Sequence, residues 1–432
     1  MSQQNIPDFT SHVSDAKFVG ASNFKRQKTN DTPKIQVKRF HHLEFYTGDA
    51  TSEMKRFSIG LGMKLMAKSD HETGNHEYIS YVLQSNDLMF VMTSPYSENA
   101  PRPKTMTQPN PSFSNSHAHD FFRKHGLAVK AIGLLVDDAA QAYQYAIENG
   151  GIPVTKPVVC GEGDDQVIFS EISAYLAGDV VLRFISFANK DNEGKFLPGY
   201  LDLSAETPNI NYGLRRIDHC VGNAEKAMPV YAYLNRVMGF YKFAEFIAED
   251  VGTKESGLNS VVCSNHNEMV LLPLNEPTYG TKKISQIQNY LEHNEGPGVQ
   301  HLALLSDDIY ETVRKMKETW AGFDFQRQPH ADYYSKIVPK KMGDKISQEE
   351  VEKCKELAIL IDTEGEGTLL QIFTQPLGDR PTIFIEIIQR QGCPLPQGGQ
   401  AAGCGGFGKG NFGSLFKSIE DYMADKGLSS RE

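Results

Sequence analysis

Three polar residues interrupt apolar segments of the chain: His219, His301 and Glu386. Each lies in a short run of β-branched, aliphatic or aromatic residues, a composition typical of a buried strand. A charged group on an apolar strand face must find a partner, because an unpaired buried charge is too costly to keep. Two imidazoles and one carboxylate are the ligand set of non-haem Fe(II) oxygenases. The three runs span 215–222, 298–305 and 382–388.

Taken singly, each of these residues has a simpler explanation, such as a core histidine or a buried salt bridge. Their regular spacing favours the metal site, because the interval from His219 to His301 nearly equals the interval from His301 to Glu386. Side chains alternate between the two faces of a strand. Strict alternation places His219 on the face of Ile217, and His301 on the face of Val299.

The first half of the chain contains weaker copies of the same strands. Only one of the three ligand positions keeps a residue that binds metals. We therefore expect the first half to bind no metal and to serve as a scaffold. The copies lie at 38–45, 131–138 and 180–187, with His42, Ala131 and Arg183 at the three ligand positions.

The repeat predicts an α+β protein, in which four strand–helix–strand units pair into two open, barrel-like halves. A chain of 432 residues is long enough for two domains. A doubly wound parallel sheet is the alternative, and consecutive strands without a helix at 260–273 and 357–388 argue against it. The expected parts are a disordered arm (1–33), an N-terminal scaffold domain without metal (34–188), a linker (189–211), a C-terminal iron-binding catalytic domain (212–404), and a glycine-rich loop with a gating helix (405–432).

The overall charge restricts the partners of the protein. A net charge of −10 and a pI near 5.8 argue against nucleic acid and anionic membranes. No apolar run approaches the ~20 residues needed to span a bilayer. The segment 1–33 lacks a signal-peptide core, so we expect a cytoplasmic protein, with a plastid location as the alternative. The six cysteines form no Cys-x-x-Cys pair, which favours free thiols in a reducing compartment.

The segment 403–413 is rich in glycine and resembles two phosphate-binding patterns. No apolar strand precedes it, so we reject both the P-loop and the dinucleotide-binding interpretation. The following stretch, 414–427, has the apolar spacing of an amphipathic helix. That helix either packs permanently on the core or acts as a gate over the metal site. Periodicity does not distinguish the two.

The ligand strands and this tail together resemble the plant and algal 4-hydroxyphenylpyruvate dioxygenases. That family belongs to the vicinal-oxygen-chelate superfamily, whose fold is built from paired βαβββ modules. The resemblance extends from about Lys38 to Gly427. The matching stretches are 216–222, 256–260, 271–277, 285–288, 298–303, 369–373, 379–390 and 405–412.

The resemblance implies one Fe(II) per chain, held by His219, His301 and Glu386. Strict alternation turns Gln300 away from the face of His301, so a role for Gln300 requires a twist or bulge. The implied catalytic residues are Gln286, Gln300, Gln371 and Phe384. The implied substrate-binding residues are Val221, Ser260, Pro273, Asn275, Leu360, Phe373, Phe407, Asn411 and Phe412.

The resemblance also implies an activity. The enzyme would convert 4-hydroxyphenylpyruvate and O2 to homogentisate and CO2, through oxidative decarboxylation, ring hydroxylation and side-chain migration. This reaction serves tyrosine and phenylalanine catabolism and, in photosynthetic organisms, plastoquinone and tocopherol supply. We expect a homodimer. The alternatives are a 4-hydroxymandelate synthase, disfavoured by the identities of Pro273, Asn275 and Phe384, and a non-catalytic ligand-binding protein of the superfamily, disfavoured by the intact triad.

Overall fold

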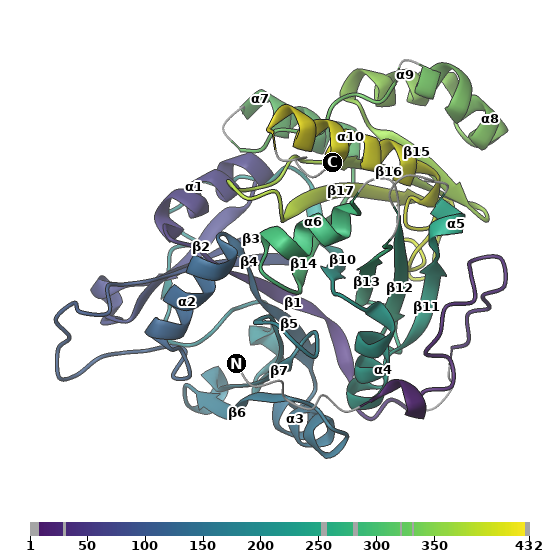
Figure 1. Ribbon diagram of the computed structural model, residues 1–432. Coiled ribbons are helices and arrows are strands. Elements are labelled where there is room, and N and C mark those ends of the chain that lie inside the picture. The colour runs from purple at the N-terminus through teal and green to yellow at the C-terminus, as the bar shows by residue number, and fades with distance from the viewer. Residues whose placement is uncertain are drawn as a thin grey trace.

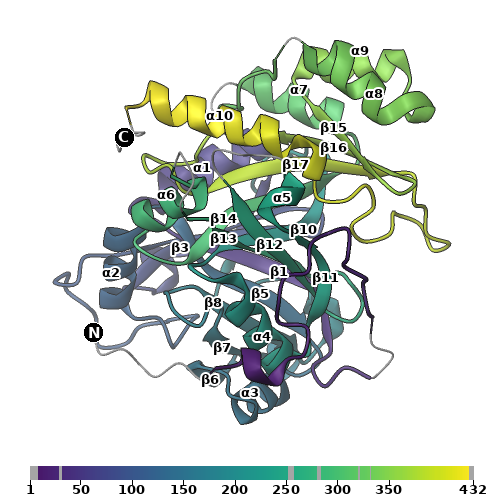
Figure 2. The same ribbon diagram turned by 45° about the vertical axis from the view of Figure 1, so that its right-hand side comes forward.

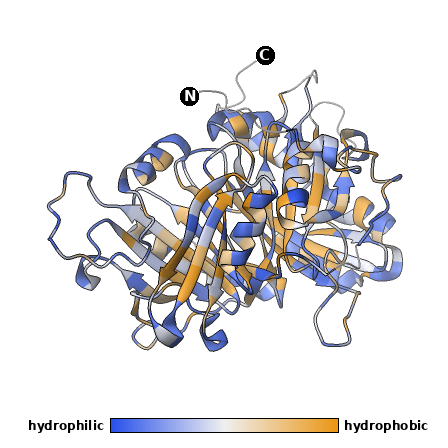
Figure 3. Cartoon of the chain, turned by 90° about the horizontal axis from the view of Figure 1, so that it is seen from below, coloured by the Kyte–Doolittle hydropathy of each residue, from blue (hydrophilic) through white to orange (hydrophobic). Residues whose placement is uncertain are grey.

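The computed structural model describes residues 8–28, 32–251, 257–279, 284–319, 322–330 and 332–427. The chain forms two large mixed sheets, one in each half, placed side by side with their helices (Figure 1). Apart from the N-terminal arm, which is dark purple and lies at the right beside β11, the first half lies to the left and below. The second half, teal to yellow, lies above and to the right. Apolar residues concentrate on the strands of both sheets, whereas the loops are largely hydrophilic (Figure 3).

In the part of the first half that the structure describes, a nine-stranded sheet packs with three α-helices. Its elements are β1 (Val37–Tyr46), α1 (Ala50–Leu61), β2 (Lys64–Ser69), β3 (Tyr78–Ser85), β4 (Leu88–Pro95), α2 (Asn115–His125), β5 (Ala128–Val136), α3 (Ala139–Glu148), β6 (Pro153–Cys160), β7 (Val167–Ser173), β8 (Val181–Phe187) and β9 (Leu201–Asp202).

The second half consists of an eight-stranded sheet and its helices. Its elements are β10 (Leu214–Asn223), α4 (Ala227–Met238), β11 (Tyr241–Phe246), α5 (Ala248–Val251), β12 (Leu258–Ser264), β13 (Leu271–Pro277), α6 (Gln286–His293), β14 (Gly298–Ser306), α7 (Ile309–Thr319), α8 (Val338–Met342), α9 (Gln348–Leu357), β15 (Leu360–Glu364), β16 (Gly367–Phe373), β17 (Phe384–Gln391) and α10 (Phe412–Asp425).

The second sheet contains two βαβββ modules that meet at its centre. Its strand order is β11-β12-β13-β10-β14-β17-β16-β15. Within each module the first strand pairs in parallel with the last, β10 with β13 and β14 with β17. The antiparallel β10–β14 pair joins the modules. The predicted α+β fold of paired modules is therefore confirmed, and the mixed sheets rule out the doubly wound alternative.

The first sheet has the same strand arrangement, and its central strands pair in the same register. Helices α1 and α4 end at equivalent glycines, Gly62 and Gly239, with φ of 66° and 72°. These left-handed positions favour glycine at a helix end. The equivalent rows across the sheets are His219–Ala303–Glu386 in the second half and His42–Gly133–Arg183 in the first.

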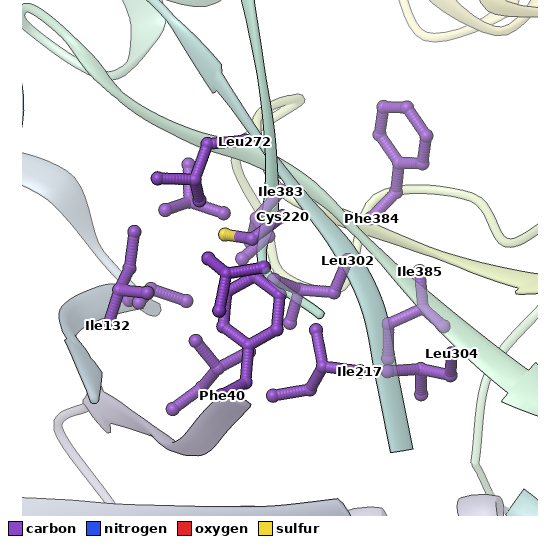
Figure 4. Packing of buried hydrophobic residues seen from close by; sticks show 14 of the residues in the cluster. Phe40, Ile132, Ile217, Cys220, Leu272, Leu302, Leu304, Ile383, Phe384 and Ile385 are labelled. Carbon is purple, nitrogen blue, oxygen red and sulfur yellow. The ribbon is translucent and has the colours of Figure 1, made fainter. Parts of the chain in front are cut away.

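One hydrophobic core joins the two halves. Phe40 and Ile132 of the first sheet face strands β10, β14 and β17 of the second (Figure 4). These contacts cover one face of the three strands and leave the opposite face for a site. The residues that these three strands contribute to the joint core include Ile217, Cys220, Leu302, Leu304 and Ile385.

The N-terminal arm corrects the expectation of a disordered segment. Between residues 8 and 28 it runs along β11 and α4 (Figure 2). Asp15 accepts a hydrogen bond from the hydroxyl of Tyr231 at 2.8 Å, and Glu245 accepts from the backbone N–H groups of Val19 and Gly20 at 2.6 Å. A polar composition predicts disorder, but here specific hydrogen bonds with the second half hold the polar segment in place. The remainder of the predicted disorder, at 1–7 and 29–31, lies outside the described residues.

Two further expectations change. The predicted linker contributes β9, which pairs with β2 and extends the first sheet to Asp202. Cys393 and Cys404 form a disulfide, so the expectation of six free thiols is wrong for this pair. The chain doubles back after β17, bringing together two cysteines 11 residues apart, which a search for close Cys pairs misses. Across the described ranges, no helix is long and apolar enough to cross a membrane.

Candidate metal centre and active site

Three adjacent strands bring the predicted ligands together. His219 lies on β10, His301 on β14 and Glu386 on β17. The Nε2 atoms of the two histidines lie 3.3 Å and 3.5 Å from Oε2 of Glu386. One ligand atom from each residue falls within 4.8 Å of the others, so a single cation can bind all three. Because neighbouring strands of one sheet supply the ligands, the site is built on a rigid support.

Two β-bulges shape this centre. In the β10–β14 pair the register shifts at Asp218 and at Gln300, the residues that precede the two histidines. A bulge sets two residues against one and locally breaks the alternation of side chains. Ile217 and Val299 therefore belong to the joint core, and the prediction that they share a face with the histidines is wrong. The bulge that a role for Gln300 requires is present.

The bulged residues orient the histidines. Oδ1 of Asp218 lies 2.9 Å from Nδ1 of His219, and Oε1 of Gln300 lies 2.9 Å from Nδ1 of His301. Both oxygens accept the Nδ1–H proton, which leaves each Nε2 directed at the centre. Metal-binding histidines are commonly fixed in this way by a partner behind the ring.

The charge of Glu386 and the neutral form of His301 suit a metal cation. Burial lowers the pKa of His219, but hydrogen bonds with Asp218 and Glu386 outweigh it and raise this pKa, so a cation must displace a proton there. Burial raises the pKa of Glu386, but hydrogen bonds and charge from His219 and His301 outweigh it and lower this pKa to about 2. Burial lowers the pKa of His301. Nε2 of Gln371 donates to Oε1 of Glu386 at 2.7 Å, which leaves Oε2 for a ligand bond. An ionised carboxylate with two imidazoles fits a 2-His-1-carboxylate metal centre.

A cavity opens onto the triad, and the empty space in it, which includes some open solvent, is about 550 Å³. Apolar and aromatic walls surround a few amide groups. Eleven of the residues expected from the family resemblance line it with the triad: Val221, Ser260, Pro273, Asn275, Gln286, Gln300, Gln371, Phe373, Phe384, Phe407 and Phe412.

Hydrogen bonds hold the segments that bring amide groups to the cavity. Ser285 caps α6 by accepting from the N–H of Ile287, and its hydroxyl donates to the carbonyl of Gly257 at 2.8 Å. This fixes Gln286 at the first turn of the helix, facing the cavity. Asn275 donates to Asn223 at 3.1 Å. Asn275 therefore has a defined side-chain position, and Gln286 a defined place on α6, before any ligand arrives.

Aromatic rings cover both histidines. The Phe384 ring stacks on His301 at 4.9 Å between centroids and 17° between planes. The Phe407 ring meets His219 edge-on at 5.4 Å. Phe407 comes from the glycine-rich loop and Phe384 from β17, so the cavity is bounded by aromatic groups from two separate segments.

Two expected substrate-binding residues lie outside this cavity. Leu360 lines a neighbouring cavity beneath α10. Asn411 stands behind Gln371, donating from Nδ2 to its Oε1 at 3.0 Å. Sequence reasoning also missed part of the lining, although Leu258 and Val262 lie two residues either side of Ser260 on one strand face, a signal that was available. The missed residues are Phe246, Leu258, Val262, Leu415 and Ile419.

The corresponding place in the first half is filled by a guanidinium group. Arg183 is 2% exposed and lies 2.7 Å from a carboxylate oxygen of Glu44 and of Glu171. Its Nη1 lies 3.1 Å from Nε2 of His42. The guanidinium group of Arg183 thus neutralises the buried carboxylates in place of a metal, which supports the scaffold role predicted for this half.

We expect His42→Ala to leave the metal content of the protein unchanged. The substitution removes a buried hydrogen-bond partner of Arg183, so it should lower the free energy of unfolding by about 1–3 kcal/mol. Denaturant unfolding and metal analysis of the same preparation measure the two effects. Loss of a bound metal in this variant would contradict the scaffold assignment.

Comparisons with known proteins agree with this geometry. No family model matches the chain. The 4-hydroxyphenylpyruvate dioxygenase of Daucus carota is 52% identical over 428 residues, covering 96% of this chain and 93% of that protein. The 4-hydroxyphenylpyruvate dioxygenase of Arabidopsis thaliana is 49% identical, covering 99% of this chain and 97% of that protein. Among solved structures, a triple mutant of 4-hydroxymandelate synthase from Streptomyces coelicolor shares the fold, with a TM-score of 0.71 at 22% identity over 90% of this chain and 99% of that one. Over nearly its whole length, this chain belongs to the 4-hydroxyphenylpyruvate dioxygenase family.

Proposed function

We propose that this protein is an iron-dependent dioxygenase that converts 4-hydroxyphenylpyruvate and O2 to homogentisate and CO2. One observation carries the proposal: His219, His301 and Glu386 converge at the wall of a cavity in a member of this family. The homodimer and the cytoplasmic location expected from the sequence stay predictions.

The donor set supports Fe(II), one per chain, with His219, His301 and Glu386 as its ligands. When bound, iron supplies the redox chemistry of a non-haem centre and leaves positions open for the substrate and O2. The protein contributes orientation. Asp218, Gln300 and Gln371 each hold one ligand by a hydrogen bond of 2.9 Å or less.

The cavity walls match an aromatic 2-oxo acid. Phe384 and Phe407 offer apolar faces for a phenol ring, and aromatic pairs add roughly 0.5–1.5 kcal/mol beyond burial. Amide groups such as those of Gln286 and Asn275 offer hydrogen bonds to the polar ends of the substrate. Helix α10 lies above β17 (Figure 2). It contributes Leu415 to the lining of the cavity, which helps to exclude water from the reacting groups.

Product identification tests this function directly. Purified, iron-loaded protein supplied with 4-hydroxyphenylpyruvate and O2 is expected to form homogentisate and CO2 in equal amounts. Chromatography against authentic standards separates homogentisate from 4-hydroxymandelate. Formation of 4-hydroxymandelate would replace this proposal with the synthase, and absence of any product would leave only a binding protein.

Phe384→Ile is expected to divert part of the product from homogentisate to 4-hydroxymandelate. Phe384 lies two residues from Glu386 on the same strand face, so its ring borders the place where the substrate is oxidised. Oxygen uptake should persist in part, because the ligands are intact. As a matched control, Phe246→Leu alters the cavity away from the ligand strands and should slow turnover without changing the product. An unchanged product in Phe384→Ile would show that this ring does not steer the reaction.

A further inference from the structure

A buried ion pair lies directly behind the metal centre. Arg390 on β17 is 5% exposed and Asp218 on β10 is 2% exposed. The guanidinium group meets the carboxylate through two bonds, Nε to Oδ2 at 3.0 Å and Nη2 to Oδ1 at 2.7 Å. Buried ion pairs are often no more stabilising than apolar residues of similar volume. Stability alone therefore does not account for this pair.

The carboxylate of this pair also holds a ligand. Oδ1 of Asp218 accepts from Arg390 and from Nδ1 of His219. A carboxylate behind a metal-binding imidazole fixes the ring and raises its basicity. His301 has the neutral amide of Gln300 in the same position. The two histidines are thus supported unequally, and only His219 is tied to a charge pair.

The guanidinium group also holds the glycine-rich loop. Its remaining nitrogen, Nη1, donates to the carbonyls of Cys404 and Gly406, both at 2.7 Å. The next residue, Phe407, places its ring 5.6 Å from the guanidinium carbon and 5.4 Å from the His219 ring. Gly405 packs so closely on β16 that an added Cβ would lie 2.5 Å from the carbonyl carbon of Thr368. The backbone of the loop is therefore seated against β16, and Arg390 helps to hold it there.

We propose that Arg390 is a positioning residue that holds His219, through Asp218, and the loop 403–408 at the same time, so that metal binding and the seating of Phe407 depend on each other. This inference rests on the proposed function, because it takes His219 as a metal ligand. Coupling between two sites is reciprocal. Metal binding should steady the loop, and release of the loop should weaken metal binding.

Substitutions can separate this role from folding. Arg390→Gln releases the loop carbonyls and leaves Asp218 with Arg216 as its cationic neighbour, 3.8 Å away. The double variant Asp218→Asn, Arg390→Gln removes both charges, so no unpaired charge is buried and the fold survives. The matched control is the pair Lys242 and Glu245, which is equally buried in the same half at 2.9 Å and contacts the N-terminal arm. Lys242→Met with Glu245→Gln removes that pair.

The test uses Co(II) alone as the metal, added to metal-free full-length protein. Titration gives the affinity, visible absorption reports the ligand field, and amide hydrogen exchange follows residues 403–408. We expect both Arg390 variants to bind Co(II) about 10–100-fold more weakly, with an altered absorption spectrum. Exchange in the loop should slow on adding Co(II) to the unchanged protein, and this response should be lost in Arg390→Gln. The control variant should behave as the unchanged protein does.

Unaltered Co(II) affinity and spectrum in the double variant would overturn the proposal, as would loop exchange that ignores Co(II). These readouts are independent of homogentisate formation. If the unchanged protein forms homogentisate while the variants bind Co(II) normally, only the positioning role fails. If the Co(II) results are as expected in a protein that forms no homogentisate, only the proposed function fails.

Discussion

Replacing Glu386 with Gln is expected to abolish homogentisate formation and to remove most of the bound iron. The amide keeps the shape of the side chain and still accepts the hydrogen bond from Gln371, so the sheet should fold normally. It no longer offers the negative charge that draws a cation to the two imidazoles. Losing a partner behind a ligand typically costs about 10–100-fold in metal affinity, and losing a ligand should cost more. Metal analysis and product assays on one preparation measure both effects.

A matched control comes from the first half of the chain. Glu44 is also buried in a sheet, 3% exposed and paired with Arg183. Glu44→Gln should reduce stability but leave iron content and turnover near those of the unchanged protein. If Glu386→Gln retains normal iron and activity, the metal assignment is wrong, whatever the behaviour of the control.

Deleting residues 412–432 is expected to abolish homogentisate formation while iron binding persists. Helix α10 supplies Phe412, Leu415 and Ile419 to the cavity wall, so its removal opens the site to water. The ligands come from strands of the second sheet and do not depend on the helix. Cutting at this point keeps the glycine-rich loop and its bonds to Arg390. Turnover is followed by product analysis, and iron by metal analysis.

Normal turnover in the shortened protein would show that α10 has only a structural role. A second measurement distinguishes a gate from a permanently packed helix. Exchange of the α10 amides should be faster than in β10 and β14 without substrate, and should slow when substrate binds. Equally slow exchange in both conditions would contradict the gate, because a helix that opens must expose its hydrogen bonds.

The repeat made much of this fold predictable from the sequence. Four similar units implied four modules, and the register confirms that Arg183 stands where Glu386 stands. Period-two alternation succeeded on β17, which is regular. It failed for Ile217 and Val299, because a bulge changes the face without leaving a clear mark in the composition.

Contacts between distant segments were harder to foresee. Asp218 and Arg390 are 172 residues apart, and nothing local in either strand indicates their pairing. The polar composition of the N-terminal arm suggested disorder. The partners that hold the arm, such as Glu245, lie in the second half of the chain and are not visible in its own sequence. Asn411 does not line the cavity and contacts it only through its hydrogen bond to Gln371. In each case the missing information was the tertiary contact.

The most direct test of this account is an iron titration of activity. Metal-free protein receives increasing Fe(II) in the presence of 4-hydroxyphenylpyruvate and O2, while oxygen uptake and homogentisate are measured together. We expect no homogentisate without Fe(II), and a rise in activity that ends at one iron per chain, the capacity of the site formed by His219, His301 and Glu386. Turnover without iron, or activity that continues to rise toward two irons per chain, would contradict it.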